Sequence, residues 1–501
     1  MIGALAIGID FASVNLALPA IQSEFGMDLN GAQWIINGYV VSFAVLMVTG
    51  GRFADTYGRR KLFLIGQVIF GLASLIGGLS PSGSIIIAAR VLQGVGAACL
   101  WPALMGITCA SVDEKHRGSA VGAVIGAASL GNVAGPVVGG ALTQWLSWRW
   151  VLLINVPLAI FAAAIAAFFV AEQKGELKRE ADDWIGIAVV SSGLIALMIS
   201  VDQSMIWTWL NWKTLSLLIG AIVLLTIFPA IERGRSNALV PYDLMRNPSF
   251  MCACLVIACA CQVFFIINLY LPEYFEKFRA YDPLQAGLHV AAFMLGFAMV
   301  SFTSGKLSEW LGAKPMVTGG LLIISATMVL LALLGPDIAW YVQSALLIIV
   351  GIGLGAIIPA VTTAAVAAAG VARASLASGI SFMAQLAGAA LIFAIATTLF
   401  ANIATGSLEH RLGTIWLKST QLQQAALISL LVGAETAQAV SKPGPADPPI
   451  SEIQVARESY LGALRATFLF SAAVTLVASL VALLWVGGPL HRRAGPEESK
   501  K

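Results

Sequence analysis

Charged residues and histidines are scarce in this sequence. Only 11% of its 501 residues are Asp, Glu, Lys or Arg, whereas a soluble globular domain carries about 25%. A catalytic or metal-binding site needs several titratable side chains close together, but the four histidines are scattered, at His116, His289, His410 and His491. The net charge of +3 forms no basic patch for nucleic acid. We therefore predict neither an enzyme, nor a metal site, nor a nucleic-acid-binding protein.

Cysteines are few, and they occur within apolar runs. The six are Cys99, Cys109, Cys252, Cys254, Cys259 and Cys261. This placement does not indicate a disulfide framework, and we interpret the thiols as small residues that suit helix packing. The stretch GIGLGA at 351–356 also lies in an apolar run with no strand before it. It is therefore not a dinucleotide-binding loop, and no cofactor is expected.

Long apolar runs, in contrast, fill most of the chain. Hydrophobic residues make up 58% of the sequence, and stretches of about 18 or more apolar residues are typical of transmembrane helices. The sequence thus predicts an all-α polytopic membrane protein with fourteen transmembrane helices. The expected spans are 1–21, 32–51, 62–79, 84–110, 117–143, 149–171, 185–202, 214–231, 250–272, 284–307, 316–334, 338–361, 375–402 and 461–487.

Lysine and arginine are concentrated in alternate loops. Arg59, Arg60 and Lys61 follow the second expected span, and further basic residues follow the last one. Since cytoplasmic loops of membrane proteins carry an excess of basic residues, we expect both termini in the cytoplasm and the chain in the cell inner (cytoplasmic) membrane. The opening MIGALAIGID has no basic segment of a signal peptide. It leaves nine residues before Asp10, so the native N-terminus is expected upstream of Met1.

The two ends of the chain repeat each other. NLALP at 15–19 recurs as NLYLP 253 residues later, and GRFADTYG at 51–58 recurs as GKLSEWLG 254 residues later. Gly94, Gly96 and Pro102 recur 257 residues later as Gly351, Gly353 and Pro359. Duplicated halves are common in transporters. We expect a six-helix bundle in 1–171, a linker with two inserted helices in 172–249, a second six-helix bundle in 250–487 with a long outer loop at 403–460, and a cytoplasmic tail in 488–501.

Asp10 and Arg90 are the two charged residues predicted to lie deep in the hydrocarbon region. A charge at a helix centre costs about 2.5–3.5 kcal/mol on insertion scales, so such residues pair or face a cavity. The repeat does not duplicate them, because the second half has Val263 and Leu347 at these positions. Two interpretations stay open: a static ion pair that fixes helix packing, or a protonatable carboxylate tuned by an arginine.

The end of the second span and the fifth span contain residues that helix packing alone does not require. Asp55 lies near the C-terminus of the second span, where the helix dipole disfavours a carboxylate. It is expected to find a cation or the N-terminus of a neighbouring helix as its partner, with Gly58 making the tight turn. In the fifth span, regularly spaced glycines allow a neighbouring backbone to approach closely. Pro136 removes a backbone hydrogen bond there and predicts a bend.

These motifs resemble those of the major facilitator superfamily, in particular its fourteen-span drug:proton antiporters of the multidrug-resistance type. The stretches IDFASVNLALP and SWRWVLLINVP (147–157) resemble the same branch. The resemblance implies a major facilitator fold and alternating access, with Asp10 and Arg90 in proton coupling. It also implies a cytoplasmic gate made by Gly51, Asp55, Gly58, Arg59 and Arg60, and an antiporter helix with Gly131, Gly135, Pro136, Gly139 and Gly140.

The resulting hypothesis is a proton-coupled antiporter that exports amphipathic or cationic small molecules, such as drugs and toxic compounds. An importer of a small metabolite on the same fold and a non-transporting structural homologue remain alternatives. The expected partners are a small-molecule substrate, protons and the lipid bilayer, and in a two-membrane bacterium also a periplasmic adaptor. Candidates for the substrate pathway are Asn15, Gln93, His289 and Gln385.

Overall fold

The computed structural model describes residues 1–27, 29–172, 182–207, 211–235, 237–279, 281, 283–413, 423–424, 427–428, 431 and 450–485. The regular elements within these ranges are all helical, and fourteen helices are long and apolar enough to cross a membrane. The prediction of an all-α fold with fourteen transmembrane helices is confirmed. It holds for the pair expected around 185–231 too, where the spans are Trp184–Gln203 and Trp212–Glu232.

Six spans form an N-terminal bundle. α1 packs along α5, and α4 packs against both α2 and α3. The sixth span is divided into a short α6 and a longer α7, of which α7 covers α3. The helices are α1 (Ile2–Phe25), α2 (Leu29–Tyr57), α3 (Arg59–Gly78), α4 (Gly83–Ala110), α5 (Arg117–Trp145), α6 (Arg149–Leu153) and α7 (Asn155–Phe169).

Six further spans form a C-terminal bundle. α12 packs along α14, while α20 lies against α13, α16 and α11. Its fifth span is interrupted by a π-helical turn, Ala384–Gly388, between α15 and α16. The helices are α11 (Pro248–Arg279), α12 (Pro283–Leu311), α13 (Ala313–Leu334), α14 (Trp340–Ala369), α15 (Ala374–Met383), α16 (Ala389–Leu412) and α20 (Ile450–Trp485).

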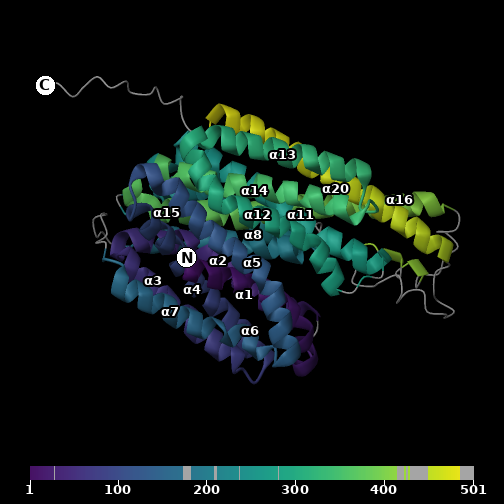
Figure 1. Cartoon of the computed structure of the whole chain (residues 1–501), viewed down its shortest axis with the longest axis horizontal. Helices are drawn as coiled ribbons and strands as arrows, with labels where there is room; N and C mark the ends of the chain where they lie inside the picture. Colours follow the sequence, from purple (N-terminus) through teal and green to yellow (C-terminus); the bar gives the residue numbers. More distant parts are fainter. Residues whose placement is uncertain are drawn as a thin grey trace.

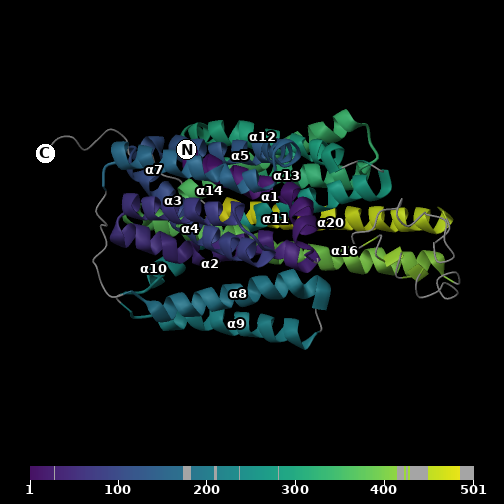
Figure 2. The same cartoon turned by 90° about the horizontal axis from the view of Figure 1, so that it is seen from below.

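The two inserted helices, α8 (Trp184–Trp207) and α9 (Trp212–Glu232), lie side by side along the outside of the bundles (Figure 2). The short α10 (Tyr242–Met245) follows them. Two hydrogen bonds tie this region to α2: Asn37 Nδ2 donates to Asp202 on α8 over 2.7 Å, and the Tyr57 hydroxyl donates to Asp182, just before α8, over 2.6 Å. Asp202 is therefore a polar anchor of the inserted pair that hydropathy alone did not single out.

The predicted outer loop at 403–460 is too long at both ends. α16 continues to Leu412, and α20 already begins at Ile450. The hydropathy pattern ends where charges begin, but the helices continue because these charges find partners: Arg411 pairs with Glu458, and Arg457 pairs with Asp337 over 2.7 Å. Residues 432–449 of this loop, residues 173–181 of the expected linker and the tail at 488–501 lie outside the described residues.

The bundles meet at one end, which we call the closed end: the C-terminal turns of α2 and α4 with the N-terminal turns of α5 and α15. α5 packs along α12, and α15 packs against α2 and α4. Figure 1 shows the bundles together near α15 and diverging toward α6 and α16. The structure thus shows one arrangement of the two bundles, in which they are in contact at the closed end and separated at the other.

Candidate functional site

Asp10 is completely enclosed between three helices. Its side chain has no exposed surface, and three donors converge on its carboxylate. Arg90 Nη1 donates to Oδ2 over 2.7 Å, while Gln93 Nε2 and Asn155 Nδ2 donate to Oδ1 over 2.9 and 2.7 Å. A face of small residues on α1 allows this burial, since Gly3, Ala6, Ser13 and Ala17 are buried together with Asp10.

Arg90 is held just as firmly and is 2% exposed. Besides Asp10, its guanidinium donates to the backbone carbonyl of Ile35 over 3.1 Å and to Gln93 Oε1 over 2.6 Å. It also lies 4.3 Å from the centroid of the Tyr39 ring, a favourable cation–π distance. α1, α2, α4 and α7 therefore meet in one polar network inside an apolar bundle.

This arrangement links the charge of Asp10 to helix packing. Removing one partner of a buried ion pair costs about 3–5 kcal/mol, because the other charge stays buried without compensation. A proton on Asp10 would leave Arg90 in that position, so protonation favours a rearrangement of α1 against α4. Asn155, the third donor to Asp10, was not among the residues predicted from the sequence. It could have been identified as a polar residue in the otherwise apolar segment LLINVP.

Asp55 joins the two bundles at the closed end. It is 1% exposed and forms an ion pair with Arg59, with Nη2 and Oδ1 2.9 Å apart. The backbone N–H groups of Ser375 and Leu376, at the start of α15, donate to it over 3.3 and 2.8 Å. The sequence predicted either a cation or a helix N-terminus as the partner, and the structure provides both. A carboxylate is stabilised at a helix N-terminus by the helix dipole.

The other residues of the predicted gate surround this contact. Arg59 also donates to the carbonyls of Gly106 and Val371, over 3.3 and 2.5 Å. A Cβ atom on Gly51 would lie 2.6 Å from the carbonyl oxygen of Ser375, so only glycine fits there. Gly58 has a φ of 111°, which confirms the tight turn. Arg60 instead stays within the N-terminal bundle, where it donates to the carbonyl of Ala167.

The repeat places a second carboxylate at the same end. Glu309 in GKLSEWLG corresponds to Asp55 in GRFADTYG, and it accepts a hydrogen bond of 2.7 Å from the backbone N–H of Ser119 at the start of α5. Its side chain is exposed, whereas Asp55 is buried. Each bundle thus caps a helix of the other, but the contact of Asp55 is the better shielded of the two.

The glycines of α5 form two rows that face different partners. Gly118 and Gly122 touch α12 of the other bundle, close to Gly305. Gly131, Gly135 and Gly139 touch α1, and a Cβ atom on Gly139 would lie 2.7 Å from the backbone oxygen of Ser13. α5 continues as one helix across Pro136. It therefore connects the bundle interface with the helix that carries Asp10.

The α1–α5 contact can be tested with two adjacent glycines. Gly140 has room for a methyl group, because its nearest neighbour would be Leu16 Cδ1 at 3.6 Å. Alanine in a helix is favoured over glycine by about 1 kcal/mol, so Gly140→Ala is expected to leave the thermal unfolding temperature unchanged or raise it. Overpacking costs about 1–3 kcal/mol, so Gly139→Ala is expected to lower it. Equal shifts in purified protein would contradict this packing.

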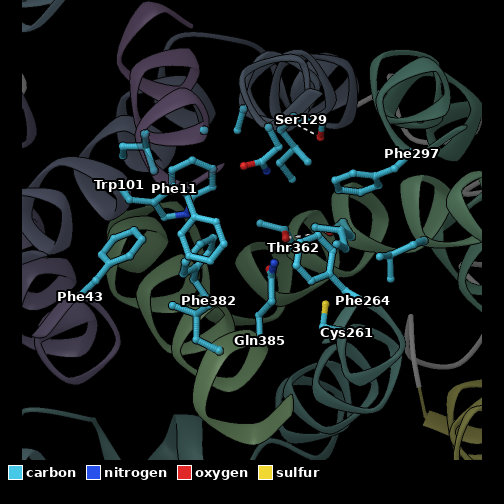
Figure 3. A pocket seen from close by; sticks show the side chains of 18 of the residues that line it. Phe11, Phe43, Trp101, Ser129, Cys261, Phe264, Phe297, Thr362, Phe382 and Gln385 are labelled. Atoms are coloured by element: carbon cyan, nitrogen blue, oxygen red, sulfur yellow. Dashed lines mark hydrogen bonds between the residues drawn. The ribbon is translucent and has the colours of Figure 1, made fainter. Parts of the chain in front are cut away.

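A cavity lies between the bundles, with about 960 Å³ of empty space that includes open solvent. Both bundles line it, and aromatic side chains point into it from several helices (Figure 3). Its rings are Phe11, Phe43, Trp101, Phe264, Phe265, Phe297 and Phe382, and its polar side chains are Ser129, Asn132, Cys261, Thr362, Ser378 and Gln385. An apolar pocket with a few polar groups is typical of a small-molecule site.

The four candidates for the substrate pathway separate in the structure. Gln385 lines the cavity, whereas Gln93 belongs to the network around Asp10. Asn15 is exposed and is not among the lining residues. His289 lies away from the wall as well: its Nδ1 is 2.9 Å from the carbonyl of Gln285, and its ring packs against Phe275 and Tyr281.

Comparison with known proteins gives a consistent result. Residues 1–393 match the family model described as Major Facilitator Superfamily. The chain is similar to the multidrug resistance protein Stp of Mycobacterium tuberculosis (strain CDC 1551 / Oshkosh), with 28% identity over 100% of this chain and 93% of Stp. It is also similar to the tetracenomycin C resistance and export protein of Streptomyces glaucescens, with 26% identity over 99% and 91% of the two chains.

A solved structure supports the fold. The crystal structure of the human organic anion transporter MFSD10 (TETRAN) superposes with a TM-score of 0.58 and covers 96% of this chain and 98% of that one. At 14% sequence identity, this likeness concerns the arrangement of the helices alone.

Proposed function

The chain belongs to the Major Facilitator Superfamily and is a multi-pass membrane transporter rather than an enzyme, and from this premise we propose that it exports small molecules in exchange for protons. The names of its relatives support the direction of transport. One is a multidrug resistance protein, and another is a resistance and export protein. Export from the cytoplasm is the simplest way in which a transporter confers resistance.

The observation that carries proton coupling is the buried pair of Asp10 and Arg90. The two side chains are 0% and 2% exposed, and a membrane-embedded carboxylate of this kind marks a proton pathway. One charge that crosses a membrane potential of 100 mV releases about 2.3 kcal/mol. This energy sustains roughly a 50-fold concentration gradient of an uncharged substrate for each proton.

Alternating access follows from the position of the bundle contacts. We assign the closed end to the cytoplasm, because it holds Arg59, Arg60 and Lys61 and basic residues favour that side. Both termini are then cytoplasmic, and the present arrangement is open to the outside. In our proposal, protons reach Asp10 in this state, the α1 network loosens, and the contact of Asp55 with α15 opens to admit substrate from the cytoplasm. In a two-membrane bacterium a periplasmic adaptor would receive the exported compound.

The test uses everted membrane vesicles that contain the full chain and have an acidic interior. A panel of uncharged, cationic and anionic compounds is added, and both the pH gradient and compound uptake are recorded. We expect a subset of compounds to accumulate inside and to dissipate the pH gradient, unlike in vesicles without the chain. Accumulation without proton movement would refute antiport. Movement of the compound only outward from the vesicles would indicate an importer, and no movement at all a non-transporting homologue.

A further inference from the structure

Some residues that line the cavity are related to one another by the sequence repeat. Phe11 and Phe264 are 253 positions apart, and Phe43 and Phe297 are 254 positions apart. All four line the cavity, and both separations fall within the offsets of the sequence repeat. The two bundles therefore present equivalent rings to the cavity, and the site lies between matching surfaces.

The same relation pairs two amides. Asn132 on α5 and Gln385 in the π-helical turn are 253 positions apart and both line the cavity. Asn132 Oδ1 is buried without a hydrogen-bond partner in the described residues, an arrangement that native proteins rarely leave unsatisfied. Gln385 points into the cavity from the opposite bundle (Figure 3), and π-helical turns are frequent at functional sites. A ligand between the bundles can thus meet one amide on each side.

Charge is missing from the wall. None of the residues that line the cavity in the described part of the chain is Asp, Glu, Lys, Arg or His. A buried cation needs an anionic partner to compensate its lost hydration, which costs several kcal/mol for each ion. Cation–π contacts with the aromatic rings return about 0.5–2 kcal/mol and so offset only part of this cost. Asp10 cannot serve, because its carboxylate is enclosed by Arg90, Gln93 and Asn155.

We propose that this cavity selects uncharged, flat, polycyclic aromatic compounds that carry hydrogen-bonding groups at two opposite edges. The phenylalanines contact the faces of the ring system, and Asn132 and Gln385 each bind one edge. This assignment rests on the proposed function, since it names the substrate class of the same transporter. It narrows the expectation from the sequence, which included cationic compounds.

Two probes with the same ring test the proposal by equilibrium dialysis against the purified full-length chain in nanodiscs. One is an anthraquinone with a carboxamide at each end, and the other has one carboxamide replaced by a trimethylammonium group. We expect the dicarboxamide to bind about tenfold more tightly or better, because one hydrogen bond and the cost of burying a charge separate the two. Equal or tighter binding of the cationic probe would overturn the proposal.

Variants of the two amides make the test specific. Asn132→Ala and Gln385→Ala are each expected to weaken dicarboxamide binding by about tenfold, whereas Asn15→Ala, an exposed asparagine on α1, is not. Gln385→Glu adds a charge at nearly constant shape and is expected to reverse the preference toward the cationic probe. A gain of binding cannot come from misfolding. If both alanine variants bind like wild type, or Gln385→Glu keeps the wild-type preference, the proposal is wrong.

The proposed function and the substrate class can fail independently. Selective binding of the dicarboxamide without any transport in vesicles would refute export while the substrate class stands. Transport in which the cationic probe is preferred would refute the substrate class while export stands.

Discussion

Replacing Asp10 with asparagine will reduce proton-coupled transport by about 200-fold, which corresponds to the lower part of the 3–5 kcal/mol range for breaking a buried ion pair. Asparagine keeps the shape of the side chain and an oxygen that accepts from Asn155, but it has neither a charge for Arg90 nor a site for a proton. Substrate-dependent collapse of the pH gradient in everted vesicles measures the loss. Exchange of labelled for unlabelled substrate should persist, because it moves no net proton.

The double variant Asp10→Asn with Arg90→Gln separates coupling from packing. It removes both charges, so that no buried charge is left without compensation, and an uncompensated charge is the main cost of breaking a buried ion pair. We expect it to regain most of the thermal stability that Asp10→Asn loses, but not proton coupling. If the double variant transports with a normal pH response, the pair is a static packing element. Asp113→Asn, an exposed aspartate in a loop, is the control for the substitution itself.

Gly305→Leu will prevent the closed end from forming and lower transport by about tenfold or more, since overpacking costs about 1–3 kcal/mol even where neighbours can shift. A Cβ atom on Gly305 would already overlap the carbonyl oxygen of Gly118 on the facing α5. A Cβ atom at Gly287, on the same α12, would meet nothing within 4 Å, so the same substitution there should be harmless.

Cys109 reports whether the closed end has opened. It is 1% exposed on α4, and its carbonyl accepts a hydrogen bond from Arg117 at the start of α5. In a chain that keeps Cys109 as its single cysteine, a membrane-impermeant maleimide added to everted vesicles should react faster in Gly305→Leu than in Gly287→Leu. Asp55→Asn, which weakens the cap on α15, should accelerate the reaction in the same direction. Slow labelling in both variants would contradict the role of these contacts.

The fold and the charged pair could be read from the sequence because each leaves a signal within one helix. Apolar length defines a span, and the small residues around Asp10 define its inward face. For Asp55 the sequence predicted the type of partner, a cation or a helix N-terminus, but not its identity. The sequence of one helix does not reveal which neighbouring helix faces it. The sequence did not identify Asn155 and Glu309 as site residues for the same reason, because their contacts depend on how separate helices align in space.

Local geometry set the other limit. The segment ISFMAQLA, which contains the π-helical turn, has no proline or glycine pair that would predict such a turn. The sequence therefore indicated Gln385 only as a candidate for the cavity wall. The ends of α16 and α20 were placed too near the apolar core, because helices extend into water wherever ion pairs such as Arg457 with Asp337 hold them.

The two faces of α1 have a consequence for the energy economy of the cell. Asp10 lies on one face, against α4 and α7, while Ile7, Gly8 and Phe11 line the cavity on another. If Asp10 carries the proton, as we propose, the proton and the substrate do not compete for one group, and strict exchange depends on the stiffness of α1. If α1 yields on one face without moving on the other, protons slip inward without cargo. The close contact of Gly8 with the backbone of Ala128 on α5 restricts such independent movement of α1. It therefore limits a proton leak that would drain the membrane potential.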